Sequence, residues 1–209
     1  NHHGLMIAGE AALSNWDAGM DMYIYGKLGN LIMTKEGINV LMTNLTGKVP
    51  PILQRLDYIR FNGEAAGYLH DLTLTGLFHT GAGMVKTDVM MSIDEQSMSR
   101  TYSGSVASAD LDLGKLLNQE KKFGKVDFNV ELKGFNYKNR YPESYIKGII
   151  SSFEYSQYQY ENIMLDGVYK DGGFNGRLSM DDANGSVQID GNFNVAKTIP
   201  DFNLKASVK

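Results

Sequence analysis

The sequence predicts a mainly β protein, built as a long antiparallel meander with two short helices. Segments of alternating apolar and polar residues recur along most of the chain, and this alternation is the pattern of strands with one apolar and one polar face. The 209 residues include 23 glycines but only 4 prolines, a balance that suits strands joined by tight turns. The links are short, whereas a parallel return would need about a dozen residues or more.

The strands follow one another in order. Near the start, residues 21–27 and 28–34 read as a hairpin, and residues 37–44 read as the next strand. Further strands are predicted over residues 58–67, 69–80, 83–93, 100–107, 124–134, 145–155, 158–170 and 200–208, with a hairpin over residues 172–193. The cleanest alternation lies in residues 124–134, where apolar and polar side chains take turns without interruption.

Two short helices interrupt this pattern. Residues 47–57 carry Pro50 and Pro51 at the helix start, where a missing amide hydrogen costs little. Residues 109–124 contain Asp112, which is placed as an N-cap. Leu111, just before it, is spaced to pack on Leu116 as a hydrophobic staple. Each helix has an apolar stripe but little length, so we expect each to pack against the end or side of the sheet.

We expect residues 1–209 to form one elongated unit of a larger protein, since the chain does not begin with methionine. Each predicted helix is followed by alternating strands that end in glycine. This pattern suggests two sub-repeats, at about residues 47–110 and 111–195. Two copies are too few to establish an array.

Composition excludes several classes of function. The net charge is −4 and the chain has no basic block, so nothing supports the phosphate contacts of a nucleic-acid-binding protein. The absence of cysteine excludes disulfides, thiolate nucleophiles and cysteine–zinc sites. No segment approaches the roughly 20 apolar residues of a membrane-spanning helix, and no signal peptide is visible.

The polar motifs do not assemble into a catalytic site. His70 and Asp71 are adjacent on a strand pattern, so their side chains point to opposite faces and do not form a base–orienter pair. The segment 181–185 begins like a calcium loop but lacks the later glutamate, and its residues are those of an ordinary turn. We predict no catalytic residue, no metal site and no cofactor.

Tyrosines cluster in the segment 155–160. Their rings are suited either to stacking on sugars or to packing on a sheet, for which tyrosine has a high propensity. Tyr155 falls on a different face from Tyr158 and Tyr160 unless a turn intervenes.

Several motifs, in order, resemble the TamB/AsmA-like envelope proteins. They are the leucine-rich turn over residues 111–117, a G-x-I strand at Gly148 to Ile150, a Y-x-Y-x-N-I-x-L-x-G strand from Tyr158 to Gly167, and an F-x-G-x-L hairpin from Phe174 to Gly185. The likeness covers roughly residues 47–195.

The resemblance implies a long β-sheet curled into an open, apolar-lined groove, with phospholipid acyl chains as the ligand. Such proteins are anchored at the inner membrane and extend through the periplasm, and they are linked to phospholipid transport and to assembly of outer-membrane barrel proteins. It therefore implies a periplasmic location. The expected partners are neighbouring segments of the same long chain and an outer-membrane barrel protein.

The apolar faces of the strands allow two interpretations. Apolar faces normally bury one another, which favours a closed sandwich or barrel, whereas the resemblance favours an open groove. The side chains expected to line such a groove and contact lipid are Val85, Val89, Met91, Val126, Phe128, Val130, Leu132, Leu178, Met180, Val187, Ile189 and Phe193.

Three other functions remain open. A closed β-sandwich would serve as a protein-interaction module, binding through its loops or a strand edge. A chaperone would hold nascent barrel strands by strand augmentation in the same groove. A glycosidase has the least support, because nothing places two carboxylates at a working separation.

Overall fold

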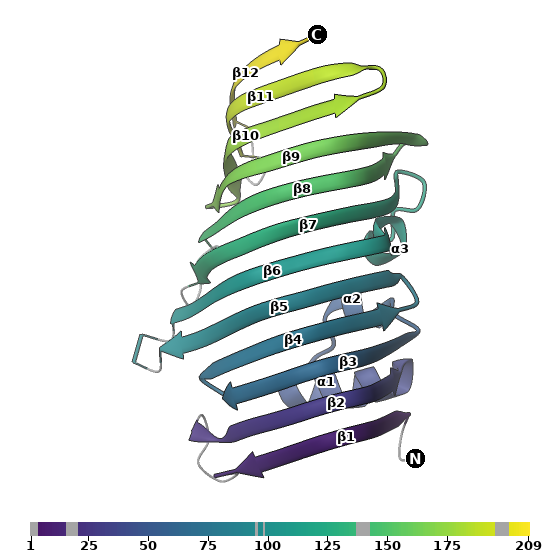
Figure 1. Ribbon diagram of the computed structural model, residues 1–209, viewed down its shortest axis with the longest axis vertical. Coiled ribbons are helices and arrows are strands. Elements are labelled where there is room, and N and C mark those ends of the chain that lie inside the picture. Colours follow the sequence, from purple (N-terminus) through teal and green to yellow (C-terminus); the bar gives the residue numbers. More distant parts are fainter. Residues whose placement is uncertain (1–3, 16–20, 95, 98, 137–142, 195–200) are drawn as a thin grey trace.

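The computed structural model describes residues 4–15, 21–94, 96–97, 99–136, 143–194 and 201–209. Within them, twelve strands form one sheet, in which β1 to β12 lie side by side in chain order (Figure 1). Every neighbouring pair is antiparallel. The sheet stays open, with β1 and β12 at its two edges. The predicted antiparallel meander is confirmed, and the described residues hold no second sheet that would close a sandwich.

The strands are β1 (Leu5–Ser14), β2 (Tyr23–Thr34), β3 (Tyr58–Tyr68), β4 (Asp71–Thr80), β5 (Gly83–Asp94), β6 (Ser99–Asp112), β7 (Phe123–Asn136), β8 (Glu143–Tyr155), β9 (Tyr158–Lys170), β10 (Gly173–Asp182), β11 (Gly185–Asn194) and β12 (Asp201–Val208). β1 was not predicted. The segment 21–34, predicted as a hairpin, forms the single strand β2, with a register shift between Leu28 and Leu31.

In the described ranges, three helices accompany the sheet, rather than the two predicted. They are α1 (Lys35–Thr46), α2 (Pro51–Gln54) and α3 (Leu113–Leu117). The helices expected within residues 47–57 and 109–124 are present but shorter. Asp112 is the N-cap of α3, and its Oδ1 accepts a hydrogen bond of 2.8 Å from the amide of Lys115. Both Leu111 and Leu116 are buried in one cluster, as a staple requires.

The prediction of a strand over residues 37–44 is wrong, because this segment belongs to α1. The side chain of Thr34 caps the helix by accepting from the amide of Gly37. Gly47 ends it in a left-handed conformation with φ of 73°. Ile38 is 1% exposed and Val40 is 46% exposed, so residues two apart point in different directions, as in a helix and unlike a strand.

The strand register separates two faces of the sheet. Residues directly opposite one another share a face, so each set of paired residues forms a row across the strands. One row runs through Leu31, Phe61, Phe78 and Val85. We call the face that contains this row the apolar face. The other face, here called the opposite face, carries rows such as Glu64, Thr75 and Asp88.

Glycines occupy two adjacent rows in the middle of the apolar face. At each of them an added Cβ would lie closer than 3.0 Å to a backbone oxygen of the neighbouring strand: these glycines are Gly63, Gly76, Gly104, Gly148, Gly167, Gly176 and Gly191. Neighbouring backbones therefore come too close on the apolar side at these positions for any side chain larger than that of glycine. Glycine allows this close approach because it has no side chain to obstruct it.

Helices cover one end of the apolar face. Ile38 of α1, Leu56 after α2 and Leu116 of α3 form a buried cluster with Ile59 and Val126 of the sheet. Figure 1 shows α1 and α2 behind the sheet and α3 beside the ends of β6 and β7. We call the three helices and the strand ends they cover, from β2 to β8, the capped end. The free end is the other end of the strands.

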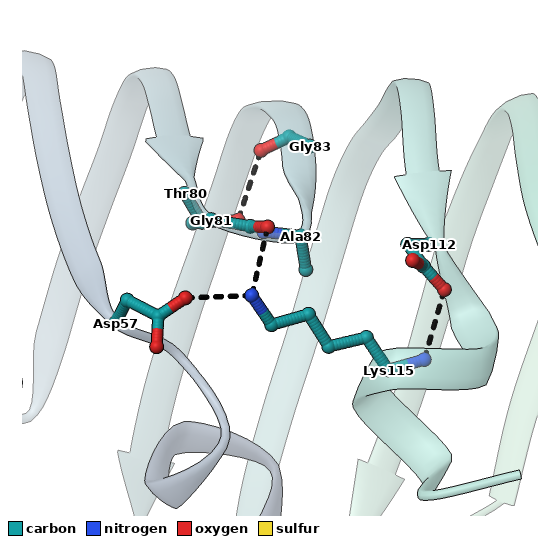
Figure 2. Close-up of polar contacts among 7 residues, drawn as sticks. All are labelled: Asp57, Thr80, Gly81, Ala82, Gly83, Asp112 and Lys115. Atoms are coloured by element: carbon teal, nitrogen blue, oxygen red, sulfur yellow. Dashed lines mark hydrogen bonds and ion pairs between the residues drawn. The ribbon is translucent and has the colours of Figure 1, made fainter. Parts of the chain in front are cut away.

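Lys115 joins separate parts of the capped end (Figure 2). Its Nζ donates a hydrogen bond of 2.6 Å to Asp57 Oδ2 and one of 3.1 Å to the carbonyl oxygen of Gly81. The guanidinium of Arg55, which follows α2, donates a second hydrogen bond between these parts, to the carbonyl oxygen of Leu116 in α3. The hydrogen bond and the positive charge of Lys115 lower the pKa of the Asp57 carboxyl. α3 is thus tied to the segment after α2 and to the β4–β5 turn.

Replacement of Gly104 tests the close approach of the strands. Gly104 has φ of 142°, and its Cβ would overlap the carbonyl oxygen of Asp88. We expect Gly104→Ala to lower the free energy of unfolding by about 2 kcal/mol or more, measured by urea denaturation. Gly29→Ala is the control, because the nearest atom to its Cβ, the Ala8 oxygen, lies 3.8 Å away. Equal stability of the two variants would contradict the explanation.

The Lys115–Asp57 pair predicts a pH dependence of stability. Because folding lowers the pKa of Asp57, the pair stabilises the fold above the unfolded pKa of about 4. This contribution disappears as the pH falls through the lowered pKa of the folded protein. Urea unfolding should therefore show Lys115→Met less stable than the parent at neutral pH, with the gap closing toward about pH 2. Lys121→Met, at an exposed lysine, should show no such trend, and a constant gap for Lys115→Met would contradict the prediction.

Candidate apolar binding face

All twelve side chains predicted to line a groove lie on the apolar face. Each belongs to a row of residues that pair across the strands. They come from four strands: Val85, Val89 and Met91 from β5; Val126, Phe128, Val130 and Leu132 from β7; Leu178 and Met180 from β10; and Val187, Ile189 and Phe193 from β11. The structure therefore brings them onto one continuous surface of the sheet.

Three of the twelve pack within the capped end. Val126 is 4% exposed, and Val85 and Phe128 pack against its cluster. Val126 is therefore closed to a ligand, and much of the surface of Val85 and Phe128 is covered by the protein's own helices and strands. The sequence did not reveal this, since alternation places a residue on a face but does not show which part of that face a helix covers.

Beyond the capped end, no second layer covers the apolar face in the described part of the chain. Met91 is 37% exposed and Phe193 is 39% exposed. The side chains of Val89, Val130, Leu132, Leu178, Met180, Val187 and Ile189 are half-buried. Partial exposure of so many adjacent apolar side chains is uncommon in a soluble domain and marks a surface available for binding.

The same surface includes residues that were not selected from the sequence. Leu72 and Leu74 of β4, Ile146 of β8 and Leu165 of β9 pair with members of the predicted set or with the glycine rows. Leu204 of β12 lies opposite Gly191 and is 44% exposed. The alternation of apolar and polar residues within each of these strands is enough to predict that these side chains lie on its apolar face. Extending the list from four strands to the whole sheet requires the register, which shows that all the strands share one apolar side.

Aromatic rings gather where β7, β8 and β9 meet at the capped end. The β8–β9 turn brings Tyr155 opposite Tyr158, so the tyrosines share a face after all. The ring centroids of Tyr158 and Tyr160 are 4.6 Å apart, and those of Phe123 and Tyr155 are 5.3 Å apart. Turn residues Ser156 and Gln157 both have positive φ. Glycine or asparagine usually signals such a turn, and neither is present.

The opposite face carries the cross-strand ion pairs of the sheet, together with exposed apolar side chains such as Met90 and Met164. Arg177 Nε lies 2.7 Å from Asp190 Oδ1, and Lys147 Nζ lies 3.7 Å from Asp166 Oδ2. Hydrogen bonds from Gln188 and Arg177 lower the pKa of Asp190. These cross-strand pairs link neighbouring strands on the side that faces water.

Two surface depressions lie mainly on this opposite face, each of about 540 Å³. One contains the exposed pair Ile149 and Met164 beside Lys147 and Asp166. The other lies beside Tyr145. Both are open to solvent, and neither contains a nucleophile paired with a base.

The polar motifs have structural roles. His70 Nδ1 lies 3.6 Å from Asp21 Oδ1, and its ring stacks on Tyr68. The turn between β10 and β11 holds Asp182, whose Oδ1 accepts from the amide of Asn184 at 2.8 Å. No group of three or more histidines and carboxylates in the described residues is arranged to hold a metal. Nor does the described chain contain a helix that is long and apolar enough to cross a membrane.

Comparison of the chain with protein-family models, with curated proteins and with solved structures found no match.

Proposed function

We propose that the apolar face binds phospholipid acyl chains and shields them from water, as one segment of a lipid conduit. The observation that carries this proposal is the continuous apolar surface beyond the capped end. It extends from β4 to β12 and includes Leu74, Val89, Leu132, Ile189 and Leu204.

Such a surface suits a flexible hydrocarbon chain. Each methylene group removed from water contributes about 0.8 kcal/mol without any directional bond. Successive strands lie about 4.8 Å apart and present similar side chains, so neighbouring positions along the sheet are nearly equal in energy. The glycines alternate in these two rows with larger side chains such as Leu132 and Leu178, so the surface is uneven and offers low positions between them. Movement of a lipid along this surface needs no catalytic group.

The cellular setting proposed here rests on the resemblance of the motifs to TamB/AsmA-like proteins. The segment would lie in the periplasm as part of a protein anchored in the inner membrane. Neighbouring segments of the same chain would continue the lipid path. A barrel protein of the outer membrane would be a partner at its far end.

A second candidate function is strand augmentation, in which the sheet edge holds a nascent barrel strand. This candidate rests on the resemblance to proteins linked to the assembly of outer-membrane barrel proteins, and on the backbone hydrogen bonds that an added strand would form with a sheet. The closed interaction module has no corresponding support, because the described strands form a single open sheet.

Lipid content tests the proposed function directly. The purified, detergent-free protein is incubated with phospholipid vesicles, separated from them, extracted with solvent and measured by mass spectrometry. We expect bound phospholipid in the parent. A variant with Leu165→Asp and Ile189→Asp should lose most of it, because each carboxylate would have to be desolvated against an acyl chain. Both residues flank Leu178 on the apolar face.

The matched control carries Met164→Asp and Gln188→Asp. These residues precede the test positions on the same strands, and both flank Ser179 on the opposite face. The control has the same number of new carboxylates and should keep the lipid. Circular dichroism confirms that both variants are folded. A folded parent without lipid, or equal lipid loss in the two variants, would refute binding on the apolar face.

A further inference from the structure

Arg100 has an unusual position on the sheet. It pairs with Ile93 of β5 and with Asn136 of β7, and this row belongs to the apolar face. Among the paired strand residues that the structure describes, it is the only basic residue on that face. Its side chain is exposed, and it forms no ion pair with any described residue.

The paired strand carboxylates nearest to Arg100 in the described chain belong to the opposite face. Asp71 pairs with Ser92, and Asp94 pairs with Ser99. Asp94 accepts two hydrogen bonds of 2.7 Å from Ser97. Glu143 lies 2.7 Å from Lys170. Because these acidic groups face away or are engaged elsewhere, the positive charge of Arg100 stands beside the apolar face without a neutralising partner among the residues that the structure describes.

Along β6, the side chains on the apolar face change from polar to apolar within a few residues of Arg100. Next along β6, the hydroxyl of Tyr102 forms a hydrogen bond with Ser144. Tyr102 also pairs with the exposed Met91. Farther along, Gly104 and Val106 lead into the middle of the face. Arg100 to Val106 spans about 20 Å, more than the roughly 15 Å of one leaflet's hydrocarbon.

We propose that Arg100 binds the phosphate of a phospholipid at the free end, while the acyl chains lie on the apolar face toward its middle. A guanidinium forms paired, charge-assisted hydrogen bonds with phosphate oxygens. This inference rests on the proposed function and adds to it the orientation of the lipid and a preference for an anionic head group.

The test is a competition between lipids that differ only in the head group. The protein is incubated with vesicles that contain phosphatidylglycerol and diacylglycerol with identical acyl chains, and native mass spectrometry gives the ratio of the two bound lipids. We expect Arg100→Gln to lower the ratio of phosphatidylglycerol to diacylglycerol by roughly three- to tenfold relative to the parent. The amount of bound diacylglycerol should not fall. Arg100→Lys should restore part of the preference, since it keeps the charge but not the paired donors.

Arg60→Gln is the control, because Arg60 is also exposed but lies on the opposite face, paired with His79. It should leave the ratio unchanged. Lipid binding with an unchanged ratio in Arg100→Gln would overturn the assignment of Arg100 alone. Absence of both lipids from the parent would overturn the proposed function and this inference with it. Binding of free glycerol 3-phosphate as tight as that of phosphatidylglycerol would show a site for soluble phosphates instead.

Discussion

The structure depends on close contact between strands on one side of an open sheet. The central glycines let neighbouring backbones approach on the apolar side. The apolar side chains beside the glycines are half-buried by one another, without a second layer in the described residues. Helices complete the burial only at the capped end, where Ile38, Leu56 and Leu116 form the cluster. Beyond the capped end, an apolar surface of this size favours association with other apolar surfaces.

Most of the sheet was predictable because alternation is a direct consequence of strand geometry. The predictions failed where alternation is ambiguous or interrupted. The segment 37–44 contains β-branched residues but is a helix, and its start at Thr34 and its end at Gly47 were the better signals. The irregular pairing near Leu28 joins two predicted strands into one. The turn after Tyr155 has positive φ at serine and glutamine, for which the sequence carries no usual signal.

The sequence was enough to predict which side chains lie on the apolar face, but not which of them are covered by other parts of the protein. Alternation placed Val85 and Val126 correctly, yet long-range packing decides that they lie within the capped end. The contribution of Leu165 depends on its pairing with Leu178, which is a property of the register. For the same reason, the sequence could not show that Arg100 lies on a different face from the nearby described carboxylates. Its charge is visible in the sequence, but only the register shows that the nearby carboxylates belong to the other face.

In the described chain, the extensive contacts between strands are those between neighbours in the sequence, so the sheet is organised in one dimension. In such an architecture, stability is approximately a sum of local units and their interfaces. Insertion or loss of a pair of strands would preserve the alternating direction of the chain and the cross-section of the sheet while changing its length. Evolution can therefore adjust the span of such a protein in steps of one hairpin, with little repacking elsewhere.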